Sequence, residues 1–143
     1  MIGTRPFSQA LDRLKRHGLR PTRQRLALVK LLFDRGDRHL TADQLHAEAA
    51  AAGVRVSLAT VYNTLNQFTA AGLLREVVVE AGRSYFDTNT SEHHHAMVEP
   101  TGELFDIPAG DVRLSALPPL PPGTKLRRVD VILRVVKSQD PAS

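Results

Sequence analysis

The sequence predicts an α+β fold in which a helical N-terminal part precedes a part built mainly of strands. Residues 7–72 carry apolar side chains at helical spacing, in four segments that each end at a glycine. From residue 73 onward the apolar spacing changes to the alternation that is typical of strands. The length of 143 residues suits one domain or two small ones, and the change in spacing favours two.

The four predicted helices are bounded by residues suited to helix ends. Thr41 is followed three residues later by Gln44, which is the pattern of a capping box. The predicted N-caps are Ser8, Thr22, Thr41 and Ser57, and the predicted stops are Gly18, Gly36, Gly53 and Gly72. In the fourth helix, residues 58–71, the apolar side chains share one stripe made of Leu58, Val61, Leu65 and Phe68.

Two predicted strands follow the fourth helix. The segments "LLREVVVE" and "RSYFD" read as strands joined by a tight turn at Ala81-Gly82. A helix over 41–52, a short connection, a helix over 58–71 and then a hairpin have the order of a winged helix-turn-helix. We therefore predict a winged helix-turn-helix domain over residues 1–88.

The remaining residues, 89–143, have few apolar side chains. The segment "AMVEPTGELFDIP" predicts two short strands around a Pro-Thr-Gly turn, and a short helix is expected near residues 112–117. Residues 125–137 alternate, which predicts a strand with one buried face. Because so small a core is marginal alone, we predict a small α/β dimerisation domain that completes its sheet and core in a homodimer.

Charge and composition exclude several classes of protein. Residues 1–40 carry ten Lys and Arg against three Asp, a net charge of +7, whereas residues 83–143 carry −1. A basic part joined to a near-neutral part indicates a polyanion-binding module with a second function. The absence of cysteine restricts any metal site to imidazole and carboxylate ligands. No apolar run approaches the ~20 residues that span a bilayer, and the start lacks an apolar signal core, so we expect a cytoplasmic protein without a membrane partner.

The outer face of the fourth helix predicts DNA binding. Opposite its apolar stripe lie Thr60, Asn63 and Gln67, with Tyr62 on one flank. This face is uncharged, and amides and hydroxyls are the groups that hydrogen-bond base edges. The predicted phosphate contacts are Lys15, Arg20, Arg23 and Arg25. The alternatives are a polar helix packed on another protein surface and nonspecific nucleoid binding.

Three consecutive histidines follow the hairpin. In an extended segment His93 and His95 point to one side and His94 to the other. Imidazole binds iron, zinc and haem, so we predict a ligand-binding role; the alternative is a solvated loop. A metallohydrolase is a further alternative, but it needs a general base beside its metal, and neither Glu92 nor Glu99 lies in an H-E-x-x-H helix.

Three stretches resemble the ferric uptake regulator family of bacterial repressors: "GLRPTRQRLALVKLL", "HLTADQLHAEA" and above all "VSLATVYNTLNQFTAAGLL". The resemblance covers residues 8–107. It implies a homodimer whose winged helices read palindromic operators on double-stranded DNA. It also implies base contacts by Tyr62 and Asn63 and a minor-groove or backbone contact by Arg20. Many members have arginine at the position of Asn63, so a different base preference is expected.

The same resemblance implies a metal site at the hinge between the two domains. The matching ligands are His39 before the third helix, Asp87 on the second wing strand and His94 of the triplet. The family's fourth ligand matches Ala96, so one ligand is missing. The two Cys-x-x-Cys pairs of many members are absent as well. The ion implied for this site is divalent iron, manganese or zinc.

A branch of the family offers a second ligand. The segments "TSEHHHAMVE" and "RVDVILRV" look like the iron response regulators of alphaproteobacteria, which sense iron through haem. The family's second metal site would use His93 and His95, but its C-terminal histidine is missing here. We therefore predict an iron- and haem-responsive regulator of iron and haem metabolism genes, with haem bound by the triplet His93, His94 and His95. A divalent-metal-dependent repressor is the alternative.

Overall fold

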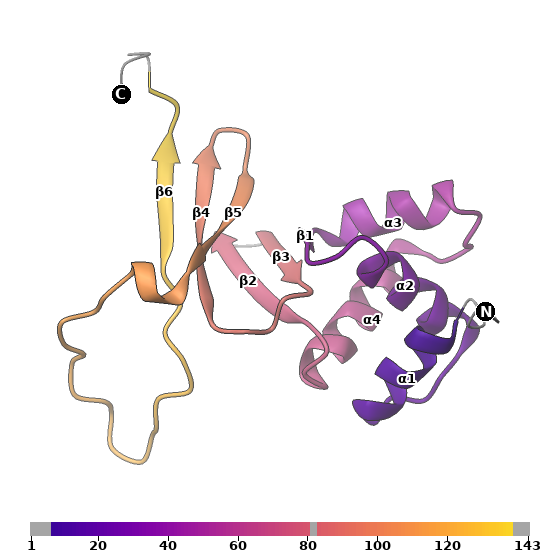
Figure 1. The fold of residues 1–143 in the computed structure, drawn as a ribbon, viewed down its shortest axis with the longest axis horizontal. Helices are drawn as coiled ribbons and strands as arrows, with labels where there is room; N and C mark the ends of the chain where they lie inside the picture. Colours follow the sequence, from indigo (N-terminus) through magenta and orange to yellow (C-terminus); the bar gives the residue numbers. More distant parts are fainter. Residues whose placement is uncertain (1–6, 81–82, 139–143) are drawn as a thin grey trace, which may run out of the picture. The chain divides into compact units, whose positions relative to one another are not determined.

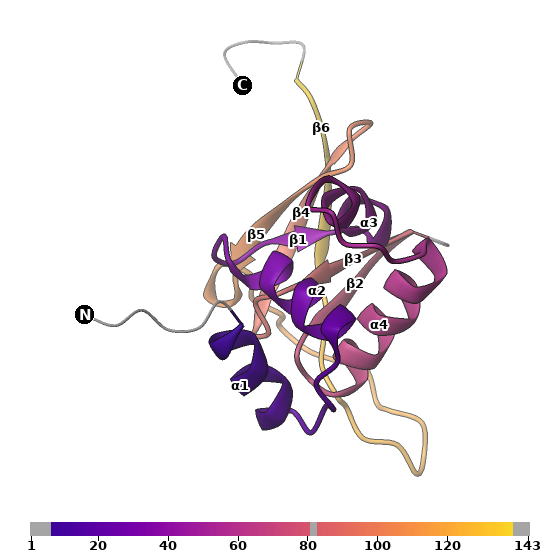
Figure 2. The same cartoon turned by 90° about the vertical axis from the view of Figure 1, so that its right-hand side faces the viewer.

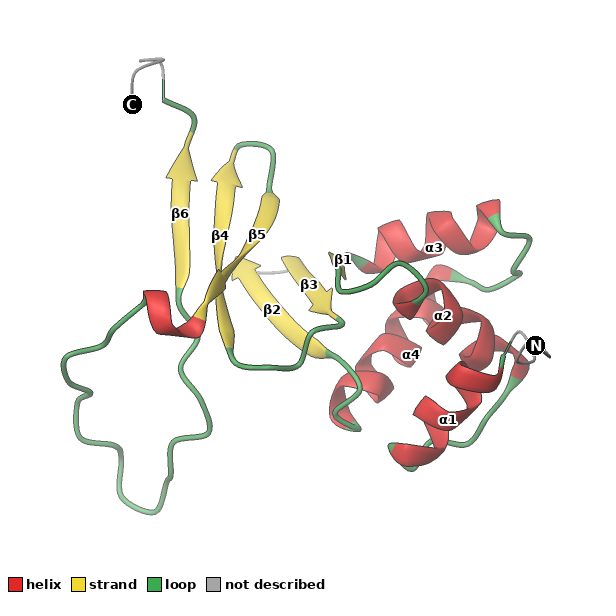
Figure 3. Cartoon of the chain, viewed as in Figure 1, coloured by secondary structure: helices red, strands yellow, loops and turns green. Residues whose placement is uncertain are grey.

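The computed structural model describes residues 7–80 and 83–138, and its mixture of helices and strands confirms the α+β class (Figures 1 and 3). The chain forms two compact units, residues 1–90 and 91–143. The helices are α1 (Ser8–Arg16), α2 (Arg23–Phe33), α3 (Ala42–Ala51), α4 (Leu58–Ala70) and the short 3-10 helix η1 (Ala109–Asp111). The strands are β1 (His39–Leu40), β2 (Arg75–Glu80), β3 (Arg83–Asp87), β4 (His93–Glu99), β5 (Glu103–Pro108) and β6 (Ile132–Val136).

Three of the four predicted N-caps are confirmed. The Thr22 hydroxyl accepts the backbone N–H of Arg25 at 3.2 Å. Thr41 and Gln44 form both hydrogen bonds of the capping box at the start of α3. Ser57 Oγ accepts the backbone N–H three residues later at 3.1 Å. Each of these side chains satisfies a backbone donor that has no partner within its own helix.

The prediction of Ser8 as the first N-cap is wrong. The backbone N–H of Leu11 bonds to the carbonyl of Phe7 at 2.8 Å, so the first turn already begins at Phe7 and Ser8 lies inside the helix. The end of α2 also differs. This helix ends at Phe33 rather than near Gly36. Its last helical hydrogen bond runs from the Asp34 N–H to the Lys30 carbonyl at 3.0 Å.

The helices of the N-terminal unit pack on one another and on a small antiparallel sheet. α2 contacts α1 and α3, and α3 contacts α4 (Figure 2). The sheet has the order β1-β3-β2. The predicted turn at Ala81-Gly82 lies outside the described residues. Within residues 7–80 and 83–90, fifteen buried side chains form the core, and Val61, Leu65 and Phe68 of the predicted stripe are fully buried in it. Among residues 7–80 and 83–138, no helix combines the length and apolar character needed to cross a membrane.

The C-terminal unit is a sheet of order β5-β4-β6 with little apolar cover. β4 and β5 are antiparallel, as the predicted Pro-Thr-Gly turn requires, and β4 and β6 are parallel (Figure 1). Among residues 91–138, Met97 and Leu104 are the large apolar side chains classed as buried. Residues 112–131 form a long, mostly exposed loop between η1 and β6 (Figure 3).

Two predictions for the C-terminal unit are wrong. The last strand is limited to Ile132–Val136 rather than 125–137, since pairing with β4 extends only over these five residues. In a single chain its apolar side chains Leu133 and Val135 are 46% and 39% exposed. The expected helix at 112–117 is not formed, because an isolated short helix needs an apolar surface to pack on, and Leu114 and Leu117 are about half exposed.

Candidate DNA-binding face and metal site

The exposed face of α4 carries the side chains predicted to contact bases. Tyr62 is 43% exposed, and Asn63 and Gln67 are exposed on the side of the helix away from the core. Thr60 is partly buried, and its hydroxyl accepts a hydrogen bond from Ser57 Oγ at 2.9 Å. Thr60 therefore also belongs to the cap that fixes the start of α4.

The predicted phosphate-binding side chains lie around the start of α2. Arg20 and Arg23 are exposed. Arg25 donates to the Arg20 carbonyl at 2.9 Å and to Gln67 Oε1 at 2.8 Å. Since Gln67 is on α4, Arg25 links the basic segment to the helix that carries the base-contact candidates. With its oxygen bonded to a guanidinium, the Gln67 amide keeps its NH₂ group as a donor.

The three histidines occupy β4, the central strand of their sheet, and the predicted alternation is confirmed. His93 and His95 are 5% and 2% exposed on one face, and His94 is half-buried on the other. Strand β5 pairs alongside, with His95 directly opposite Asp106. Directly opposite residues of an antiparallel pair share a face, so Asp106 lies on the same face as His93 and His95.

The geometry of this face fits a metal ion. His93 Nε2 and His95 Nε2 each lie 3.5 Å from Asp106 Oδ1. The two imidazole rings meet edge to face with centroids 4.6 Å apart. Nitrogen and oxygen ligands about 2.1 Å from one tetrahedral ion stand ~3.4 Å from each other. Each imidazole nitrogen is therefore close to ligand spacing from the Asp106 carboxylate, and the ligand atoms of His93, His95 and Asp106 all lie within 4.8 Å of one another. Two imidazoles and a carboxylate suit zinc, iron or manganese.

The backbone fixes opposite tautomers on the neighbouring histidines. His93 Nδ1 lies 2.7 Å from the carbonyl of Ser91, which can only accept, so Nδ1 carries the proton and Nε2 keeps its lone pair. His94 Nδ1 accepts the backbone N–H of Val131 at 3.1 Å, so the neutral ring carries its proton on Nε2. His93 therefore directs its lone-pair nitrogen, Nε2, toward Asp106, whereas the lone pair of neutral His94 is on Nδ1 and accepts the Val131 N–H.

The N-terminal unit holds the other two predicted ligands side by side. His39 and Asp87 are directly opposite each other in the β1–β3 pair and so lie on one face of that sheet. Asp87 is 1% exposed, and its Oδ1 accepts the backbone N–H of Asn89 at 2.9 Å. The His39 ring stands edge-on to Tyr85, with centroids 6.1 Å apart. A buried carboxylate beside an imidazole is a pair of donors suited to a divalent ion.

Comparison with known proteins places the chain in a family. Residues 16–115 match the ferric uptake regulator family. The chain belongs to this family. It is 38% identical to the peroxide operon regulator of Bacillus subtilis over 101 residues, which are 71% of this chain and 69% of the relative. It is 33% identical to the ferric uptake regulation protein of Bordetella parapertussis over 100 residues, 69% of this chain and 72% of the relative.

Solved structures of ferric uptake regulators share the fold. The regulator of Pseudomonas aeruginosa with manganese has a TM-score of 0.70 at 27% identity, covering 91% of this chain and 98% of that one. The regulator of Vibrio cholerae has a TM-score of 0.68 at 25% identity, covering 88% and 98%. Members of the ferric uptake regulator family are metal-responsive transcriptional regulators. The chain is therefore a regulator of transcription and not an enzyme, and the metallohydrolase alternative is excluded.

Proposed function

We propose that this ferric uptake regulator family member is a repressor that binds operator DNA as a homodimer and changes its DNA affinity when a divalent ion, ferrous iron in particular, is bound. The observation that carries the proposal is the close approach of His93, His95 and Asp106 on one sheet face. The solved relative that contains manganese supports a divalent ion. A regulator of this kind acts where the chromosome is, so we place it in the cytoplasm.

The DNA-binding part of the proposal rests on the N-terminal unit. We assign residues 1–88 to a winged helix-turn-helix in which α4 reads bases and the β2–β3 hairpin is the wing. Tyr62 and Asn63 present uncharged polar groups from the exposed face of α4. The exposed Arg20 and Arg23 supply phosphate contacts nearby in sequence. Residues 89–143 are assigned to dimerisation and ligand sensing.

The metal-binding part of the proposal names candidate ligands within each unit. His93, His95 and Asp106 come from the C-terminal unit, and we propose His39 and Asp87 as the ligands of the N-terminal unit. The sequence analysis predicted His94 as the third ligand beside His39 and Asp87. We place His94 behind His93 and His95, because its lone-pair nitrogen, Nδ1, already accepts the Val131 N–H.

Haem is the second candidate ligand, and with it the iron response regulator branch. The observation that favours it is the half-buried His94 on the face of β4 opposite His93 and His95. Haem iron needs one or two imidazoles, and this chain has no thiolate to compete. Binding through His94 would require either the hydrogen bond between Val131 N–H and Nδ1 to break or the ring proton to move from Nε2 to Nδ1. The divalent ion is the first candidate because its donors are already close together.

The test compares the two ligands on one DNA target. Purified protein is titrated with an AT-rich inverted repeat and with a scrambled duplex, in chelator, in manganese and in haemin. The proposal predicts that manganese changes the affinity for the inverted repeat by about 5- to 150-fold, the usual range of coupling between two sites. If the affinity for the inverted repeat changes with haemin but not with manganese, haem rather than a divalent ion is the regulatory ligand. Equal binding to both duplexes would contradict operator recognition and favour nonspecific nucleoid binding.

A further inference from the structure

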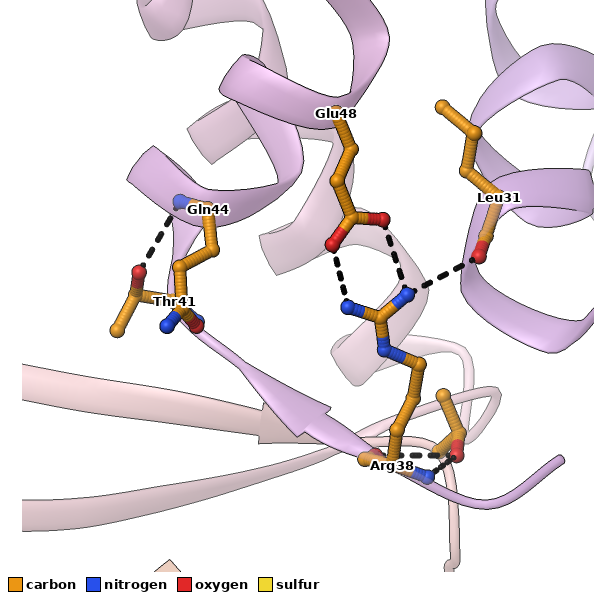
Figure 4. A network of polar contacts seen from close by, with 6 residues as sticks. Leu31, Arg38, Thr41, Gln44 and Glu48 are labelled. Carbon is orange, nitrogen blue, oxygen red and sulfur yellow. Dashed lines mark hydrogen bonds and ion pairs between the residues drawn. The ribbon is translucent and has the colours of Figure 1, made fainter. Parts of the chain in front are cut away.

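Arg38 contacts two helices of the N-terminal unit through its side chain. Its two terminal guanidinium nitrogens donate to the two carboxylate oxygens of Glu48 on α3 (Figure 4). One of them, Nη1, also reaches the carbonyl of Leu31 on α2 at 3.5 Å. The paired side chains are 20% and 24% exposed. This two-pronged geometry holds the residue before β1 against two helices.

The backbone of the same residue is joined to the end of β3. The Arg38 N–H donates to the Thr88 hydroxyl at 2.8 Å, and the Arg38 carbonyl accepts the Thr88 N–H at 2.9 Å. The Thr88 hydroxyl lies 3.1 Å from the same carbonyl. Arg38 therefore ties the chain just before β1 to the chain just after β3.

This junction lies directly beside the proposed ligands of the N-terminal unit. His39 follows Arg38, and Asp87 precedes Thr88, so the facing pair His39 and Asp87 is bounded by the junction on one side. On the other side of the two-residue strand β1, Thr41 starts α3 through its capping box (Figure 4). A shift of the ligand pair therefore has a short, bonded route into α3.

The route continues to the helix that carries the base-contact candidates. α3 packs against α4 in the core, where Leu45, Ala49, Val61 and Leu65 are buried. Close-packed side chains transmit a displacement rather than absorbing it. The capping box fixes β1 to the start of α3. The Arg38–Glu48 pair adds a second attachment one turn further along α3, because Glu48 lies four residues beyond Gln44.

We infer that Arg38 and Glu48 are positioning residues that hold His39 and Asp87 in register with α3 and so couple occupancy of the metal site to α4. The inference rests on the proposed function, because it assigns the regulation of that same site. Neither residue touches the ion. Arg38 and Glu48 act by keeping the ligand pair in place before the ion arrives and by passing its displacement to the helix-turn-helix.

The test uses Glu48→Gln, with Asp34→Asn as the matched control. Asp34 pairs with Lys30 on the exposed side of α2, at 50% and 40% exposure, so this control removes an acid from another ion pair in the same unit. Three quantities are measured for full-length protein: manganese affinity by calorimetry, the factor by which manganese changes affinity for the inverted repeat, and the melting temperature in chelator. Glu48→Gln should weaken manganese binding by ~3- to 10-fold and reduce that factor by a similar amount, whereas Asp34→Asn should match the wild type.

The outcomes separate a coupling role from a merely structural one. If Glu48→Gln lowers the melting temperature but leaves manganese affinity and the coupling factor unchanged, the pair only stabilises the fold and the inference is overturned. Arg38→Lys provides a second variant that keeps the charge but loses the two-pronged contact, and it should show the same loss in weaker form. A wild-type protein whose operator binding ignores both manganese and haemin would overturn the proposed function, and the inference with it.

Discussion

The two units of the molecule differ in how completely they bury their own apolar surface. In the N-terminal unit fifteen side chains form a closed core, with Phe68, Leu65 and Val61 at 0% exposure. In the C-terminal unit the apolar residues of β6 and the preceding loop are largely exposed, and Val136 is 71% exposed. The first unit satisfies the requirements of a stable fold within one chain. The second presents the kind of open apolar sheet that is completed by another subunit.

Under the proposed function, this difference corresponds to separate tasks for the two units. A closed core gives α4 a rigid base from which to present Tyr62 and Asn63. In the same proposal a second copy covers the open sheet of the C-terminal unit, and a dimer is what a palindromic operator requires. The candidate ligands His93 and His95 lie within the dependent unit. Assembly, ligand binding and DNA recognition are then linked rather than independent.

The largest expected effect comes from removing β6. A chain that ends at Pro122 should not form the dimer. The truncation removes β6, and with it both the parallel pairing with β4 and the exposed apolar side chains of β6. All four α-helices should remain, since they lie within residues 8–70. Light scattering reports the assembly and circular dichroism the helices. A truncated chain that stays dimeric would move the interface away from β6.

Replacing one phenylalanine in each unit by alanine compares how much each unit's packing contributes to the stability of a single chain. Phe68 is fully buried in the N-terminal unit and Phe105 is 50% exposed in the C-terminal unit. Phe68→Ala should cost about 3–5 kcal/mol of unfolding free energy, the usual price of emptying a closed core. Phe105→Ala should change the stability of a single chain by less than about 1 kcal/mol and act instead on dimer dissociation. Urea titration at several protein concentrations distinguishes these effects. Equal losses at both positions would remove the contrast between the units.

A smaller effect is expected on the recognition face. Asn63→Ala should lose about 1–3 kcal/mol of discrimination between operator and random duplex, because an amide that contacts a base carries sequence information. Arg20→Ala should instead weaken binding to both duplexes and reduce the slope of its salt dependence by about one ion. Fluorescence anisotropy at three salt concentrations measures both quantities. If the two variants behave alike on the two duplexes, α4 is not the reading helix.

Local features were the most predictable from sequence. The caps Thr22, Thr41 and Ser57 were identified because an N-cap depends on only three or four consecutive residues. The alternation of His93, His94 and His95 was predicted for the same reason. The short strand β1 was missed, since His39 and Leu40 are too few to show any period and pair with residues almost fifty positions away.

Features that depend on distant partners were predicted less well. Asp106 was missed as a ligand candidate, although the predicted Pro-Thr-Gly turn already implied a register that places it opposite His95. The tautomer of His94 could not be predicted, because it depends on the backbone N–H of Val131, which is 37 residues away in sequence and which only the folded chain brings close. The last strand was predicted too long, because its extent depends on pairing with β4, and that pairing covers only Ile132–Val136.

The most direct test asks which of the three histidines bind the metal ion. Manganese affinity is measured by calorimetry for His95→Asn and His94→Asn, with asparagine chosen because its amide oxygen can replace His94 Nδ1 as the acceptor for Val131. The account predicts that His95→Asn weakens manganese binding by ~100-fold or more, whereas His94→Asn stays within about threefold of the wild type. Loss of binding in His94→Asn together with wild-type affinity in His95→Asn would contradict it.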